Sequence, residues 1–399
     1  MKRLFTILIL AIVPALTTLA QEDRKAKDKE ILDMFFQYLG AAQIDELKLD
    51  SNVIDSVQWE ITPIGPLKLL RQENLGKWKI KAGDYSGIVW LGGKNYAVVS
   101  DKERTDGYIP FIIDMNLESG KLESVVRFDK LQGNPKPRYG LGGQYTVRDC
   151  EGITYFPSNN SFFIAGEGDQ RILEYDAYGV PTGRELAVPK EFALEQIHKN
   201  YGFESLTYSP ETHRFWCTTE SQLKTDGQPA GPECPDTENL LRLQSFGDDL
   251  QPLEQYAYKM DKCHAKERKS IYAYGVSEMV AMPDGRLLVM EREFYVTERY
   301  AGSYVIHKLY LVNPKECTPI TFADRAEDLG EEQILKKELV TRFKTELNLN
   351  RMNLANYEGM CLGPKLNDGR QTLLMINDSQ HQYGSSGFHL KDYLRVLIF

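Results

Sequence analysis

Five segments of the chain repeat one pattern of apolar and polar positions. Each segment begins with a short β-like stretch, passes through a turn, and ends in a second apolar strand that closes on an acidic residue. The turns carry residue types that favour hairpins, as in Pro283-Asp284-Gly285. We therefore expect five antiparallel hairpins. Their first strands open at equivalent positions, which are Ser86, Glu151, Glu204, Ser277 and Glu358.

Recurrence of short strands at a long period is typical of a β-propeller, in which blades repeat radially and their inner strands line a channel. The equivalent positions lie 65, 53, 73 and 81 residues apart, so some blades must carry inserted loops. We predict an all-β propeller with five recognisable blades and an N-terminal helix. Residues 305–350 leave room for a sixth, divergent blade, although LVTRFKTELNL in that segment is more typical of a helix or a loop insertion.

The two ends of the propeller segment also contain strand-like stretches, at Val57–Ile64 and Tyr393–Phe399. We expect the early strand to complete the last blade and so close the ring. Ring closure removes exposed sheet edges, and for that reason we expect a monomer.

The N-terminal residues resemble a secretion signal. Lys2 and Arg3 precede an apolar run at Leu4–Leu16 that is short for a membrane span, and Ala20 precedes a cleavage point. We predict a signal peptide at 1–20, a charged linker and amphipathic helix at 21–50, and a single propeller domain at 51–399. The mature protein is then expected to be secreted or periplasmic, with no membrane insertion after cleavage.

The formal charge is −9, and removal of Lys2 and Arg3 makes it −11. An acidic surface argues against nucleic acid as a partner and favours cations and small substrates. Six cysteines allow disulfides in an exported protein, and Cys234 with Cys263 is the candidate pair, free thiols being the alternative. The chain contains no G-x-S-x-G, H-E-x-x-H or Walker motif.

Acidic residues recur at two positions of the predicted hairpins: the start of the first strand and the end of the second strand. The start of the first strand and the end of the second lie at the same end of an antiparallel pair, so these side chains should gather at one mouth of the channel. Crowded carboxylates raise one another's pKa, and calcium, which prefers oxygen ligands, is the simplest compensation. Any one of these acids could instead cap backbone amides. The predicted metal ligands are Asp101, Glu151, Glu167, Glu204, Glu220, Glu291, Glu358 and Asp378.

Two of these acids, Glu151 and Glu204, are also the predicted catalytic carboxylates. Arg292, with Lys102 and Arg148, would neutralise charge on the transferred group, and His381 would carry a proton. In the fourth segment the acid stands one place later, at Glu278, beside Ser277. A shift of one residue along a strand turns a side chain to the other face, so Glu278 could point away from the channel.

Several of these motifs together resemble the esterase-like phytase domain family of exported bacterial propeller proteins. The resemblance runs from about Ile64 to Phe399 and rests on DCEGITY, GFESLTYSPET, VSEMVAMPDGRLLVMERE and NYEGMCLGPKLNDGRQTLLMINDSQ. It implies a propeller hydrolase that cleaves esters or phosphate esters. By likeness to β-propeller phytases, it also implies calcium at the mouth that binds phosphate oxygens and activates water.

The expected function is therefore calcium-dependent, phytase-like hydrolysis of a small-molecule phosphate ester or carboxylic ester at one mouth of the channel. Two alternatives remain at this stage. One is a non-catalytic, cation-stabilised propeller that binds a glycan, a peptide or a surface partner. The other is a sugar-lactone hydrolase, which would use a similar mouth with one divalent metal and a general base.

Overall fold

The computed structural model describes residues 29–30, 32–37, 39, 64–101, 105–131, 148–268, 271–348, 351–380, 382, 384–385 and 388–399. The chain divides into two compact units, residues 1–48 and 49–399. In the first unit, residues 29–30, 32–37 and 39 are helical. The predicted signal peptide lies outside the described residues. Among the described helices, none is long and apolar enough to span a membrane.

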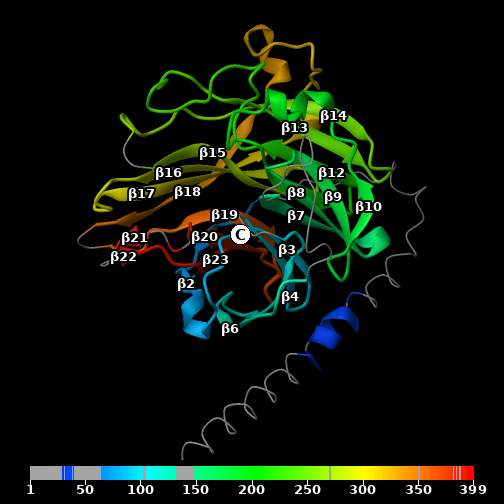
Figure 1. Cartoon of the computed structure of the whole chain (residues 1–399), viewed down its shortest axis with the longest axis vertical. Coiled ribbons are helices and arrows are strands. Elements are labelled where there is room, and N and C mark those ends of the chain that lie inside the picture. The colour runs from blue at the N-terminus through cyan, green and yellow to red at the C-terminus, as the bar shows by residue number, and fades with distance from the viewer. Residues whose placement is uncertain are drawn as a thin grey trace, which may run out of the picture. The chain divides into compact units, whose positions relative to one another are not determined.

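The second unit is a five-bladed β-propeller of antiparallel sheets (Figure 1). Blade 1 contains β3 (Tyr85–Gly92), β4 (Asn95–Ser100), β5 (Ile109–Met115) and β6 (Leu122–Arg127). Blade 2 contains β7 (Cys150–Phe156), β8 (Ser161–Gly166), β9 (Arg171–Asp176) and β10 (Pro181–Glu185). Blade 3 contains β11 (Phe203–Ser209), β12 (Arg214–Thr219), β13 (Leu240–Gly247) and β14 (Pro252–Lys259).

The last two blades complete the ring. Blade 4 contains β15 (Ile271–Ala281), β16 (Leu287–Val296), β17 (Ser303–Val312) and β18 (Lys337–Leu347). Blade 5 contains β19 (Asn356–Leu362), β20 (Thr372–Asp378), β23 (Tyr393–Ile398), β1 (Lys68–Leu69) and β2 (Glu73–Asn74). A separate hairpin is formed by β21 (Gly384–Ser385) and β22 (Phe388–His389). The 3-10 helices are η2 (Leu75–Trp78), η4 (Pro157–Asn159), η5 (Lys190–Phe192), η6 (Leu194–Gln196), η7 (Pro314–Glu316), η8 (Ala326–Asp328) and η9 (Glu331–Gln333).

The first strand of each blade is its inner strand. These strands contact one another in the order β3, β7, β11, β15 and β19, and β19 contacts β3 again. The ring therefore closes after five blades, and the prediction of a five-bladed propeller is confirmed. The sixth blade does not form, because residues 305–347 supply the last two strands of blade 4.

The interpretation of LVTRFKTELNL as a helix or loop is wrong, since most of it forms the outer strand β18. Its second half has the period-2 burial of a strand, with Phe343, Thr345 and Leu347 buried and Lys344 exposed between them. An outer strand presents one face to solvent. The polar residues on that face made the alternation typical of a strand hard to recognise in the sequence.

The two ends of the propeller segment meet in blade 5, as predicted. Lys68 pairs with Ile398, and Glu73 pairs with Leu394. In Figure 1 the label of β2 accordingly lies beside the last strand, β23. The N-terminal partner is thus residues 68–74. The predicted strand Val57–Ile64 lies, apart from Ile64, outside the described residues, and Ile64 itself is not in a strand.

Apolar residues fill the spaces between blades. Tyr85, Phe203 and Tyr357 are each completely buried in a hydrophobic cluster. All six cysteines are free, so the prediction of a Cys234–Cys263 disulfide is wrong. Burial between blades already supplies a large core, and the fold does not need covalent closure.

Candidate active site

A β-bulge interrupts the inner strand of every blade at the same place. In blade 3, Phe203 pairs with Thr219 and Ser205 pairs with Thr218, so Glu204 is the extra residue. The register shifts in the same way within Tyr85–Ile88, Cys150–Ile153, Val276–Glu278 and Tyr357–Gly359. These are the equivalent positions found in the sequence. A bulge re-aims the side chain it carries, and simple alternation along the strand could not have revealed it.

The residue after the bulge is small in four blades because the inner strands approach closely there. A Cβ atom on Gly359 would lie 2.0 Å from the carbonyl oxygen of Ser86, and one on Gly152 would lie 2.6 Å from the amide nitrogen of Leu206. Only glycine fits such backbone contacts. The repeated acid-glycine pairs of the sequence, as in Glu151-Gly152, were therefore the available signal for the bulge.

The second strand of each hairpin supplies one side chain to the mouth, one residue after the partner of the residue that precedes the bulge. Opposite the openings of blades 1, 2, 3 and 5, the paired residues are Ser100, Gly166, Thr219 and Asn377. The residue that follows is acidic each time. These side chains are Asp101, Glu167, Glu220 and Asp378.

Blade 4 differs, and one predicted ligand is wrong for that reason. There Val276 pairs with Glu291, so the residue that follows at the mouth is Arg292. Successive side chains of a strand point to opposite faces. Glu291 accordingly lies elsewhere, accepting hydrogen bonds from the Tyr258 hydroxyl at 2.9 Å and from Lys337 Nζ at 2.8 Å.

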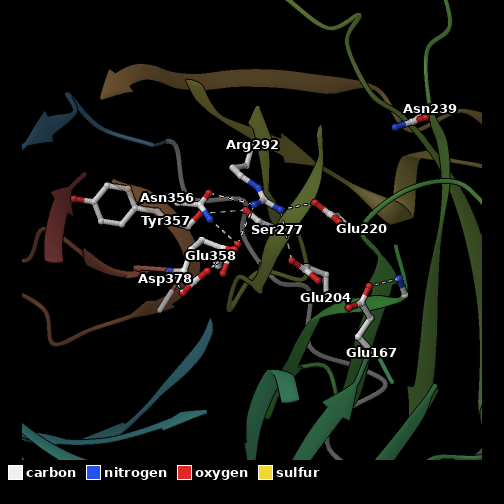
Figure 2. A network of polar contacts seen from close by, with 12 residues as sticks. Glu167, Glu204, Glu220, Asn239, Ser277, Arg292, Asn356, Tyr357, Glu358 and Asp378 are labelled. Carbon is white, nitrogen blue, oxygen red and sulfur yellow. Dashed lines mark hydrogen bonds and ion pairs between the residues drawn. The ribbon is translucent and has the colours of Figure 1, made fainter. Parts of the chain in front are cut away.

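Arg292 lies at the centre of the carboxylates from blades 3 and 5 (Figure 2). Its Nη1 donates to Glu358 Oε1 at 2.9 Å and to Asn356 Oδ1 at 3.2 Å. Its Nη2 donates to Glu220 Oε1 and lies 3.7 Å from Glu204 Oε1. Arg292 is therefore the internal counter-ion of three acids, and its Nε makes no hydrogen bond to any residue that the structure describes.

The buried acids hold their protons more tightly than ordinary carboxyls. Burial raises the pKa of Glu151 and of Glu204 well above the usual value, and the neighbouring carboxylates raise both further. Burial also raises the pKa of Glu220, to about 7, against the opposing effect of Arg292. A carboxyl that titrates near neutral pH is suited to proton transfer.

A second group of acids lies between blades 1 and 2. Ligand oxygens of Asp101, Asp149 and Glu151 lie within 4.8 Å of one another, a spacing that one metal ion could bridge. Carboxylate oxygens are the ligands that calcium prefers, so the donor set fits this ion. Asp149 was not among the predicted ligands. Its place two residues before the bulge, in Asp149-Cys150-Glu151, was the signal that could have identified it.

Other predicted acids have structural partners. Glu167 Oε1 accepts a hydrogen bond from the Gly202 amide at 3.0 Å, and Asp378 Oδ1 accepts one from the Gln380 amide at 2.6 Å. Glu278 stands in the position after the bulge, and its carboxylate accepts hydrogen bonds from the backbone amides of Met279, Leu206 and Met360. It therefore lies between the inner strands, and Ser277 takes the bulge position of blade 4.

The remaining predicted basic groups are not brought to the mouth in the described residues. Arg148 is buried inside blade 2, where its Nε pairs with Asp169 at 3.0 Å and its Nη2 donates to the Ile164 carbonyl at 2.8 Å. The prediction that Arg148 neutralises substrate charge is wrong, since its guanidinium is held in the blade. Lys102 and His381 lie outside the described residues.

Several solved structures are distantly similar to this chain. An aldose sugar dehydrogenase from Streptomyces coelicolor, in its PQQ-bound form, is 11% identical, with a TM-score of 0.38 over 84% of this chain and 99% of that chain. A calcium-binding regucalcin from Agrobacterium tumefaciens is 11% identical, with a TM-score of 0.34 over 79% and 77%. A virginiamycin B lyase variant from Staphylococcus aureus is 11% identical, with a TM-score of 0.31 over 84% and 100%.

Likenesses this weak carry no information on activity. No curated protein sequence matches the chain. The family model for phytase-like proteins, described as "Esterase-like activity of phytase", matches residues 80–381, so the chain belongs to the Phytase-like family, as its motifs predicted.

Proposed function

We propose that this protein hydrolyses small phosphate esters or carboxylic esters at the acidic mouth, with calcium bound by Asp101, Asp149 and Glu151. The observation that carries the proposal is the convergence of bulge and strand-end carboxylates from four blades on one mouth, beside Arg292. The family description supports ester cleavage as the reaction class. Calcium in this position would polarise a phosphoryl or acyl oxygen and lower the pKa of a bound water.

Three side chains of the protein would provide charge stabilisation and proton transfer. Arg292 holds Glu220 and Glu358 in fixed positions and brings positive charge beside the reacting group. Glu220, whose pKa burial raises to about 7, would exchange a proton at its carboxylate oxygens near neutral pH. Burial raises the pKa of Glu204 well above its usual value, so its carboxyl would act as an acid toward a leaving group.

The test is hydrolysis of p-nitrophenyl phosphate, p-nitrophenyl acetate and phytate, with calcium and after treatment with a chelating resin. Three variants accompany the wild type: Asp149→Asn for the metal group, Glu204→Gln for the acid, and Glu185→Gln as an exposed control. We expect calcium-dependent turnover that falls at least about 100-fold in Glu204→Gln. Glu185→Gln should retain full activity, since Glu185 pairs with Arg171 at the exposed edge of blade 2.

Turnover that is equal with and without calcium would contradict the metal assignment. Absence of turnover on all three substrates, with calcium still raising the melting temperature, would show that the carboxylates form a structural or binding site. The preferred substrate would distinguish phosphate esters from carboxylic esters.

A further inference from the structure

A pocket at the outer edge of blade 5 collects positive charge on an otherwise acidic chain. It has a volume of about 560 Å³ and is bordered by β2, β23 and the segment between β18 and β19. Among the residues that the structure describes, the charged ones in its lining are Arg71, Glu73, Lys77, Lys391 and Arg395. Four cations therefore face one acid, whereas the whole chain has a formal charge of −9.

The pocket lies at the same end of blade 5 as the mouth. Asn74 pairs with Tyr393 on β23, and the neighbouring Leu394 pairs with Ile376 on β20, two residues before Asp378. Neighbouring strands are spaced by about 4.8 Å, so three spacings place β2 roughly 14 Å from the inner strand β19. The pocket is thus distinct from the carboxylates around Arg292.

The positive charge in the pocket is largely uncompensated. Glu73 pairs with Lys77 at 3.1 Å. Within the described residues, neither Arg71 nor Lys391 forms an ion pair. Arg395 is half-buried, its Nε donates to the Leu70 carbonyl at 2.9 Å, and its guanidinium lies 4.9 Å from the ring centre of Phe343. A guanidinium withdrawn from water without an acidic partner is costly, and a bound anion would offset that cost.

The wall of the pocket is held in place by polar contacts. Gln72 Nε2 donates to the Asn353 carbonyl at 3.1 Å, and Gln72 Oε1 accepts from the Tyr357 hydroxyl at 3.3 Å. The first contact joins the segment before β2 to the segment that follows β18, and the second joins it to β19 within blade 5. The backbone that carries the cationic groups is therefore fixed, and the guanidinium of Arg395 is already held in place for an anion.

We propose that this pocket binds an oxyanion that carries two or more negative charges, through Arg71, Lys391 and Arg395. Arginine donates pairs of parallel hydrogen bonds to phosphate-type oxygens, and lysine adds a point charge. A single carboxylate would leave most of the positive charge unpaired, and for that reason a multivalent phosphate is the better fit.

The test is calorimetric titration of the full chain with inorganic tripolyphosphate at low ionic strength. Metal ions are removed beforehand with a chelating resin, because a soluble chelator is itself a polyanion and tripolyphosphate binds calcium. The pocket variant combines Arg71→Gln with Lys391→Gln. The matched control combines Lys121→Gln with Lys365→Gln, two exposed lysines outside the pocket lining.

We expect the wild type and the control to bind with equal affinity and the pocket variant to bind at least tenfold more weakly. Affinity should fall as salt is added, since the contact is electrostatic. Absence of binding to the wild type, or an equal loss in the control, would overturn the proposal. Because binding is measured without turnover, these outcomes are independent of whether the mouth is a hydrolase.

Discussion

Arg292 is the residue that sets the electrostatics of the mouth. It occupies the strand-end position that carries an acid in the other four blades. The acids Glu204, Glu220 and Glu358 surround it, all of them buried. One permanent cation therefore balances part of the negative charge of blades 3 and 5, and the group of Asp101, Asp149 and Glu151 is the calcium site that we propose.

Substitution Arg292→Met should destabilise the fold by about 3–5 kcal/mol at pH 7, because it leaves buried carboxylates without their partner. The deficit should shrink at pH 5, because Glu220, whose pKa burial raises to about 7, binds a proton there and no longer needs a cation. Urea denaturation at both pH values measures this. The control is Arg171→Met, which removes an exposed pair with Glu185 and should cost less than about 1 kcal/mol. Equal losses in the two variants would refute the assignment of Arg292 as the internal counter-ion.

Glu220 should make the stability of the protein depend on pH. Burial raises its folded pKa from 4.5 to about 7, so between these values the native state holds a proton that the unfolded chain releases. Its contribution is complete below pH 4.5 and is lost as pH rises through 7. The shift corresponds to on the order of 3 kcal/mol. Glu220→Gln should therefore flatten the fall in unfolding free energy between pH 4.5 and 7, as measured by urea denaturation across this range.

The matched control for this pH dependence is Glu185→Gln at the exposed edge of blade 2. It should leave the slope of the wild type unchanged. If Glu220→Gln also keeps the wild-type slope, then the proton is held on a neighbouring acid, and Glu220 is not the group that titrates near pH 7.

At the scale of the element, the bulge is the unit that repeats. It places one side chain per blade at the mouth, and the small residue behind it lets neighbouring inner strands touch. This explains why the acids recur at one position although the blades differ greatly in loop length. The same geometry explains why Glu278, one residue further along, binds backbone amides instead of facing the mouth.

Substitution Gly359→Ala should therefore be poorly tolerated. Its Cβ would meet the Ser86 carbonyl oxygen at 2.0 Å, and a backbone atom cannot rotate away. We expect a loss of about 3 kcal/mol or more in unfolding free energy. Gly65→Ala is the control, since among the described residues its Cβ would have only the Phe399 carbonyl carbon nearby, at 3.8 Å. Thermal and urea denaturation of both variants measure the difference, and equal stability would contradict the close contact of β3 and β19.

At the scale of the whole molecule, the ring is closed by hydrogen bonds between the two ends of the propeller segment. The Leu70 amide donates to the Val396 carbonyl at 2.9 Å, next to the paired strands β1 and β23. Leu70→Pro removes this donor, whereas Leu70→Ala shortens the side chain and keeps it. We expect the proline variant to be about 1–3 kcal/mol less stable than the alanine variant.

Guanidinium denaturation followed by tryptophan fluorescence measures this, because Trp78 and Trp90 pack against the cluster between blades 5 and 1. Coincident unfolding curves for the proline and alanine variants would mean that closure at Leu70 does not contribute to stability. A lower midpoint for the proline variant alone would support the closure.

The amino-acid sequence by itself determined the fold class, the number of recognisable blades and most of the mouth. Hydrophobic alternation and turn residues are local properties, so each hairpin could be identified along the chain. Repetition of Glu151, Glu204 and Glu358 at one position then placed them at a common end of the propeller.

Only the tertiary structure decided which side chains face the mouth in each blade. A bulge shifts the register of a strand pair by one residue. In blade 4, a difference of one residue along β16 decides whether Glu291 or Arg292 faces the mouth. Contacts between segments far apart in sequence, such as Arg292 with Glu220 and Glu358, follow from the order of blades around the ring. The same holds for the cationic pocket, where residues 71–77 meet residues 391–395. Such pairings depend on closure of the ring, which no local pattern of residues contains.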